Sequence, residues 1–119
     1  MKGIVCTKPL LLEEIEIPEP EPAAGYSILK IKRVNICGTD LHAFEGTQPY
    51  FNYPRILGHE LSGELVAVDQ ADGFSIGELV TIIPYLNCGY CLACRKGKPN
   101  CCATIKVCGV HIDGGMVEY

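Results

Sequence analysis

Five of the chain's eight cysteines fall within residues 88–102, in the stretch CGYCLACRKGKPNCC. Cys88, Cys91 and Cys94 form the pattern C-x2-C-x2-C, and seven residues separate Cys94 from Cys102. Thiolates two residues apart in a turn can converge on one ion, and four thiolates close a tetrahedral zinc site that has no open position. The spacing therefore predicts a structural zinc lobe at about residues 85–105, which stabilises the fold and performs no chemistry.

The same cysteines have alternative uses. Disulfides are one, but cysteines this crowded cannot pair with ordinary geometry, and a chain without an export signal favours metal binding. An iron–sulfur cluster is another, because C-x2-C-x2-C opens the bacterial ferredoxin pattern; that pattern continues x3-C-P, which this chain lacks. Adjacent side chains diverge, so spacing alone allows either Cys101 or Cys102 as the fourth ligand, but not both. Three nearby basic side chains would offset the charge of four thiolates: Arg95, Lys96 and Lys98.

Composition limits the remaining classes of protein. With 119 residues, 48% of them hydrophobic, the chain is long enough for one domain with a core of its own. Its net charge of −4, without a basic stripe interleaved with aromatics, argues against nucleic acid and anionic membranes as partners. The apolar run near the N-terminus, residues 10–12, is too short for a signal-peptide core or a membrane span. We therefore expect a soluble, cytoplasmic protein.

Short strand-like segments dominate the rest of the chain. Only residues 39–46 look helical, and a turn is expected at residues 69–77. The closing residues 113–119 begin a strand and stop without a turn, so we expect a fragment of a longer protein with an unpaired strand edge there. The strand-like segments are residues 2–6, 11–17, 26–36, 60–68 and 77–83. This arrangement predicts a mainly β fold, a small barrel or sandwich.

A second group of metal-binding residue types lies before the cysteine-rich stretch. Cys37 and His59 are 22 residues apart and come from different elements, and a soft sulfur with an imidazole suits zinc. A catalytic zinc site needs three protein ligands and an open position. Glu60 is a third ligand or a neighbour of the ligands, although His59 and Glu60 would face opposite ways in a regular strand. Gly58 permits the backbone bend that would bring both to one ion.

Several neighbouring residues also have an ordinary structural interpretation. Thr39 and Asp40 are N-cap candidates for the short helix, and His42 fits an exposed helical face. We expect His111 to be a turn residue. A lone buried cysteine is usually a small hydrophobic residue, so residue types alone make the Cys37–His59 pair a hypothesis.

The succession CGTDLHAF, YPRILGHELSGEL, CGYCLACRKGKPNCC and GVHIDGGMVEY resembles the zinc-containing medium-chain alcohol dehydrogenases. It is most similar to their polyol, sugar-acid and threonine dehydrogenase branch, and it covers almost the whole chain. The resemblance implies a GroES-like, partly closed β-barrel catalytic domain over residues 1–119, with a zinc lobe and little helix. It further implies an NAD(P)-dependent enzyme that interconverts a secondary alcohol and a ketone, and we expect it to be a homo-oligomer.

The resemblance also implies roles for individual residues. Cys37 and His59 would bind catalytic zinc with Glu60 beside them, and the structural zinc would be held by Cys88, Cys91, Cys94 and Cys102. Thr39 would bond the substrate alcohol, His42 would be the outer end of a proton relay, and Asp40 would lie near the metal. Zinc would act as a Lewis acid on the substrate hydroxyl.

Two departures from the family pattern matter. Family members are longer, and no G-x-G-x-x-G follows a strand here, so the nucleotide-binding domain and a further zinc ligand would lie beyond Tyr119. Gly38 stands where some classical members carry a basic residue near the cofactor phosphate, which leaves the contacts to NAD or NADP open. We therefore expect the isolated chain to be inactive. The alternatives are a non-catalytic GroES-like zinc module and an iron–sulfur electron carrier.

Overall fold

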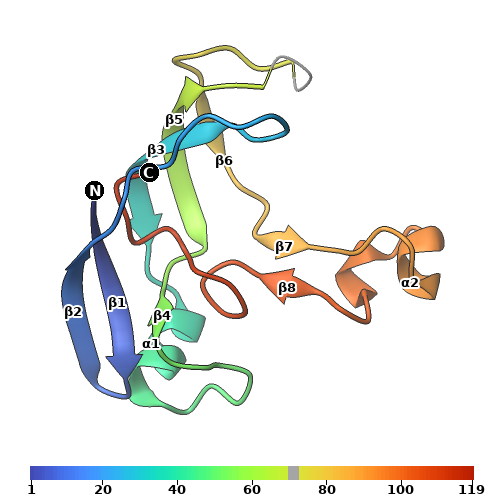
Figure 1. Cartoon of the computed structure of the whole chain (residues 1–119). Helices are drawn as coiled ribbons and strands as arrows, with labels where there is room; N and C mark the ends of the chain where they lie inside the picture. Colours follow the sequence, from blue (N-terminus) through green and yellow to red (C-terminus); the bar gives the residue numbers. More distant parts are fainter. Residues whose placement is uncertain (70–72) are drawn as a thin grey trace.

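The computed structural model describes residues 1–69 and 73–119, and most of its regular structure is β (Figure 1). The predicted turn at residues 69–77 includes residues 70–72, which lie outside the described residues. No helix in the described residues is long and apolar enough to cross a membrane. The elements in chain order are β1 (Lys2–Lys8), β2 (Leu11–Glu16), β3 (Ile28–Asn35), α1 (Gly38–Glu45), β4 (Arg55–Ile56), β5 (Glu60–Ala67), β6 (Leu79–Thr81), β7 (Tyr85–Leu86), α2 (Leu92–Arg95), the 3-10 helix η2 (Pro99–Cys101) and β8 (Lys106–Val107).

Two three-stranded antiparallel sheets form the body, with strand orders β2-β1-β4 and β3-β5-β6. In β5 the buried residues alternate, Leu61, Gly63 and Leu65, as expected for a strand with one face on a core. The ribbon β7-β8 leaves this body and carries the cysteine-rich lobe away from it (Figure 1). The cysteine-rich lobe therefore lies apart from the two sheets.

The closing residues correct one prediction. They form no strand of their own but a single bridge between Val117 and Gly3. The Ile4 amide donates to the Met116 carbonyl at 2.8 Å, and the Ile31 amide of β3 donates to the Glu118 carbonyl at 2.9 Å. This segment thus lies between β1 of one sheet and β3 of the other, and it has partners on both sides where an unpaired edge was expected. The segment pairs with β1 through an isolated bridge and two backbone hydrogen bonds, which is too little regular pairing for a strand.

The core of the body is small and lies around α1. Its buried members are Cys6, Ala43, Phe51, Leu57 and Val110. Phe51 and Tyr53 pack edge to face, with ring centroids 4.8 Å apart. Leu57 is 3% exposed and directly precedes the Gly58-His59 pair, so the core fixes the chain just before the predicted ligand.

Candidate metal centres

The first centre begins at the N-terminus of α1, where the chain turns out of β3. Cys37 is the N-cap: its Sγ accepts from the Thr39 amide at 3.3 Å, and its own amide donates to Asp40 Oδ2 at 3.0 Å. This reciprocal pair is a capping box in which a cysteine replaces the usual serine or threonine. Thr39 and Asp40 were predicted as caps, and this is corrected: Cys37 is the cap and Asp40 is the third helical residue.

His59 reaches the same place from the other side. Its Nε2 lies 3.2 Å from Cys37 Sγ, and its Nδ1 lies 3.7 Å from Asp40 Oδ1. Asp40 is only 2% exposed, and its Oδ1 also accepts from the Gly58 amide at 3.1 Å. The preceding residue, Gly58, has a φ of 91°, the left-handed region that suits glycine. The bend at Gly58 expected from the sequence is therefore present, and it turns His59 toward Cys37.

The donor set fits a zinc ion. One ligand atom from each of Cys37, Asp40 and His59 can be chosen so that all three lie within 4.8 Å of one another. Among the described residues the buried His59 Nδ1 has no hydrogen-bond partner, and an unsatisfied buried polar atom in a native fold is often a sign of a functional role. Histidine ligands of zinc commonly present one nitrogen to the metal and the other to a carboxylate. Cys37 Sγ and His59 Nε2 are thus suited as ligands, with Asp40 orienting the ring.

Glu60 lies apart from this group. It is the exposed first residue of β5, and its carboxylate accepts from Asn35 Nδ2 on the paired strand β3. His59 and Glu60 nevertheless both line one open hollow of about 490 Å³ on this side of the molecule. A neighbouring role for Glu60 is compatible with this position, while Asp40 takes the third place in the group. The spacing C-x-x-D, a capping-box signature, is the sequence signal that points to Asp40.

Thr39 and His42, predicted for proton transfer, lie on α1. Thr39 is half-buried beside Cys37, whereas the His42 side chain is 62% exposed. His42 Nδ1 is 3.0 Å from Thr47 Oγ1 and 3.6 Å from Glu45 Oε2. Among the described hydrogen bonds none joins Thr39 to His42, so the relay stays a prediction. His111 lies in a turn, as expected, and its Nδ1 accepts from the Val107 amide at 3.1 Å.

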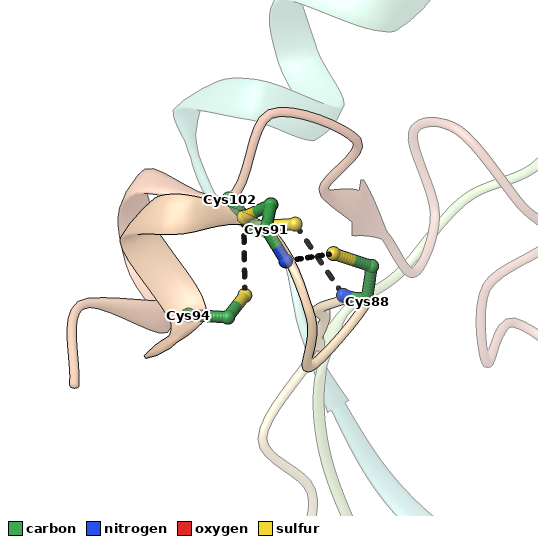
Figure 2. A group of neighbouring side chains, drawn as sticks. All are labelled: Cys88, Cys91, Cys94 and Cys102. Carbon is green, nitrogen blue, oxygen red and sulfur yellow. Dashed lines mark hydrogen bonds between the residues drawn. The ribbon is translucent and has the colours of Figure 1, made fainter. Parts of the chain in front are cut away.

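The second centre is the cysteine lobe. Its four predicted ligands come from the loop before α2, from α2 itself and from the end of η2, and their sulfurs converge in Figure 2. All four Sγ atoms lie within 4.8 Å of one another, and the group consists of Cys88, Cys91, Cys94 and Cys102. Cys102 is buried, whereas Cys101 is exposed and outside the group. The structure thereby selects Cys102, the choice that the spacing had left open.

These four sulfurs suit a single ion. The Cys91 and Cys94 sulfurs are 3.5 Å apart, and all eight cysteines are free, which contradicts the disulfide alternative. A tetrahedral site with Zn–S bonds of about 2.3 Å places its sulfurs about 3.8 Å apart. The four thiolates around an iron–sulfur cube lie farther apart than four thiolates around one ion, so sulfurs within 4.8 Å of one another favour the single ion.

Backbone amides prepare the lobe for thiolates. The Cys88 amide donates to Cys102 Sγ at 3.3 Å, and the Cys91 amide donates to Cys88 Sγ at 3.4 Å. Hydrogen bonds from the Cys94 and Ala103 backbone lower the pKa of Cys91 to about 6. Removal from water and the hydrogen bond with Cys91 raise the pKa of Cys94 to about 11. A bound cation would favour deprotonation of both thiols.

Comparison with known proteins identifies the family of this chain. Residues 23–119 match the model of the alcohol dehydrogenase GroES-like domain. The chain belongs to this family. It is 47% identical over its full length to L-galactonate-5-dehydrogenase of Escherichia coli K12 and 38% identical to L-threonine 3-dehydrogenase of Pyrococcus abyssi. It spans 35% and 36% of the lengths of these two relatives.

Solved structures of the family share the fold. The crystal structure of the E. coli CFT073 alcohol dehydrogenase RspB, complexed with NADH, matches 99% of this chain with a TM-score of 0.87 and 43% identity. Galactitol-1-phosphate dehydrogenase of Escherichia coli matches 99% of it with a TM-score of 0.88 and 32% identity. The chain covers 34% of each of those proteins. The predicted GroES-like, mainly β fold and the resemblance to zinc-type alcohol dehydrogenases are thus confirmed.

Proposed function

We propose that this chain is the GroES-like catalytic part of a longer zinc-dependent dehydrogenase, here called the parent protein. The parent interconverts a secondary alcohol of a polyol or sugar acid and the corresponding ketone, with NAD or NADP. The observation that carries this proposal is the 3.2 Å approach of Cys37 Sγ to His59 Nε2 beside the buried Asp40. A non-catalytic module would have no use for a buried sulfur–imidazole–carboxylate group with an unpartnered nitrogen.

In this proposal Cys37 and His59 hold the catalytic zinc, which when bound supplies a Lewis acid for the substrate hydroxyl. Asp40 holds the imidazole with Nε2 toward the sulfur, and Glu60 lies beside the site on the shared hollow. The lobe holds a structural zinc through Cys88, Cys91, Cys94 and Cys102. The lobe has no open position and contributes stability alone.

Proton movement falls to α1. Thr39 Oγ1 would take up the proton of the substrate hydroxyl and give up its own hydroxyl proton toward the exposed imidazole of His42, which would release a proton to solvent. The contact of His42 Nδ1 with Thr47 leaves Nε2 as the nitrogen available for this exchange. NAD or NADP, bound by another part of the parent, supplies the hydride acceptor.

The relatives support the substrate class. One is named for its action on L-galactonate and another for its action on galactitol 1-phosphate, and both substrates are chains of hydroxylated carbons, the first also a sugar acid. The relative crystallised with NADH supports the nicotinamide cofactor. We extend to the parent a small-molecule substrate and a homo-oligomeric state.

The test is an assay of the parent on a panel of polyols and sugar acids with each cofactor. His59→Ala should abolish turnover while the lobe retains its zinc. His111→Ala is the matched control, because its ring lies in an exposed turn, and it should keep near wild-type activity. A wild-type parent that is inactive on every alcohol would instead support the non-catalytic module.

A further inference from the structure

One short segment near the end of the chain, residues 113–116, lies against the residues that lead into His59. We call it the glycine segment, after Gly114 and Gly115. Three backbone hydrogen bonds and one hydrogen bond to a side chain join it to residues 56–58. They are Gly114 N to Ile56 O at 2.8 Å, Met116 N to Leu57 O at 3.0 Å, Gly115 N to Gly58 O at 2.9 Å, and Ile56 N to Asp113 Oδ1 at 3.2 Å.

The approach is close enough to require glycine. A Cβ on Gly114 would lie 2.3 Å from the Gly58 oxygen and 2.4 Å from the Leu57 oxygen. Both of these atoms are backbone, so a side chain at residue 114 can be accommodated only if residues 57–58 move. The absence of a side chain at this position therefore fixes the distance between the glycine segment and the chain that carries His59.

The peptides around Gly58 are held from two directions. Asp40 Oδ1 accepts from the Gly58 amide at 3.1 Å, and the Gly115 amide donates to the Gly58 carbonyl at 2.9 Å. His59 is the next residue. The Gly58 carbonyl belongs to the peptide group that joins Gly58 to His59, so the hydrogen bond to this carbonyl also fixes the position of the His59 backbone nitrogen. Its Nε2 lies 3.2 Å from Cys37 Sγ, a separation that a shift of residues 57–58 would change.

We propose that the glycine segment is a positioning element for His59, with Gly114 as its central residue. It touches neither the metal nor the substrate of the proposed site. It acts through the Gly58 carbonyl and so sets how closely the imidazole approaches Cys37. This inference rests on the proposed function, because it takes His59 to be a ligand of catalytic zinc.

The experiment compares Gly114→Ala with Gly63→Ala in the parent protein. Gly63 is a matched control because a Cβ there would also meet a backbone oxygen, that of Lys30, at 2.4 Å, but within the β3–β5 pair. The catalytic zinc is identified as the ion that is lost in His59→Ala. Its dissociation constant is measured by chelator competition, with the lobe zinc as internal reference, and Tm is recorded for each variant.

We expect Gly114→Ala to weaken the catalytic zinc by about 10- to 100-fold, the range found when groups that support metal ligands are altered. Gly63→Ala should lower Tm but change this affinity by less than about 2-fold, because its clash does not involve the backbone on either side of His59. Equal affinities in wild type and Gly114→Ala, with a loss of Tm like that of Gly63→Ala, would show a merely structural role and overturn the inference.

A second pair of variants serves if Gly114→Ala does not fold. Asp113 is exposed, and its Oδ1 anchors the segment by accepting from the Ile56 amide. Asp113→Ala therefore removes this hydrogen bond without introducing a clash. Asp113→Ala should weaken the catalytic zinc, and Asp113→Asn, which keeps an acceptor oxygen, should restore it. Equal affinity for the catalytic zinc in wild type, Asp113→Ala and Asp113→Asn would overturn the inference. The proposed function would still stand in that case, provided that the wild-type parent binds two zinc ions. A wild-type parent that binds only the lobe zinc would refute the proposed function itself.

Discussion

At the scale of single residues, the Cys37 sulfur makes two contacts that have different chemical requirements. Its sulfur caps α1 through the Thr39 amide, and the same sulfur faces His59 Nε2. A hydroxyl can perform the first task but is a poor substitute for the soft ligand in the second. Substitutions at this position can therefore distinguish a cap from a metal ligand.

We expect Cys37→Ser in the parent to retain the helix and lose the catalytic zinc. Serine is among the best N-caps, so the free energy of unfolding of the zinc-free protein should change little. Cys37→Ala, which removes cap and ligand together, should cost about 1 kcal/mol more than Cys37→Ser. Metal analysis and chemical denaturation measure the two effects. A serine variant that keeps two tightly bound zinc ions would contradict the ligand role.

At the scale of elements, the sequence predicted what has a period or a fixed spacing. The strand-like segments of the sequence correspond to β1, β2, β3, β5 and β6, and the helix expected at residues 39–46 corresponds to α1. The two-residue strands β4, β7 and β8 are too short to show any period, and they went unpredicted. Cys-x2-Cys spacing located the lobe, yet only the folded path of η2 distinguishes buried Cys102 from exposed Cys101.

The candidate site divides in the same way. Residue type predicted Cys37 and His59 as zinc ligands, because sulfur and imidazole suit zinc. Asp40 was expected near the metal from family resemblance alone: the C-x-x-D spacing indicates a capping box, but the approach of Asp40 to His59 also depends on the bend at Gly58. Glu60 follows His59 in an extended chain, and this geometry directs it to Asn35. Long-range contacts such as the glycine segment against residues 56–58 have no local signal in the sequence.

The lobe offers a prediction at this scale. Cys91→Ser should release the lobe zinc and loosen residues 88–102, because metal binding there is also folding free energy. Cys101→Ser is the matched control: it removes a neighbouring thiol outside the group and should keep the zinc. Elemental analysis and hydrogen exchange of the lobe report both results. Iron with acid-labile sulfide in the wild type would show an iron–sulfur cluster instead.

At the scale of the whole molecule, the two sheets and the closing segment form one body, and the lobe projects from it (Figure 1). The body buries its own core around α1 and brings Cys37 to His59. No G-x-G-x-x-G follows a strand in this sequence, so these 119 residues lack the usual fingerprint for binding a dinucleotide. Catalysis would then need a second part to orient the nicotinamide against the substrate.

We accordingly expect the isolated 119-residue chain to fold and to show no dehydrogenase activity. Circular dichroism and a cooperative unfolding transition test the first statement, and the polyol and sugar-acid panel with NAD and NADP tests the second. The parent, assayed beside it at equal concentration, is the positive control. Turnover by the isolated chain would contradict the need for a second part.

Anomalous diffraction at the zinc edge, from crystals of the parent, would show whether one chain holds two zinc sites of different kind. We expect two peaks: one enclosed by Cys88, Cys91, Cys94 and Cys102, and one bonded to Cys37 Sγ and His59 Nε2. Bonds of about 2.3 Å to sulfur and about 2.0 Å to nitrogen are expected at the second peak. A lobe peak alone, from crystals grown with zinc in excess, would show that Cys37 and His59 do not form a zinc site.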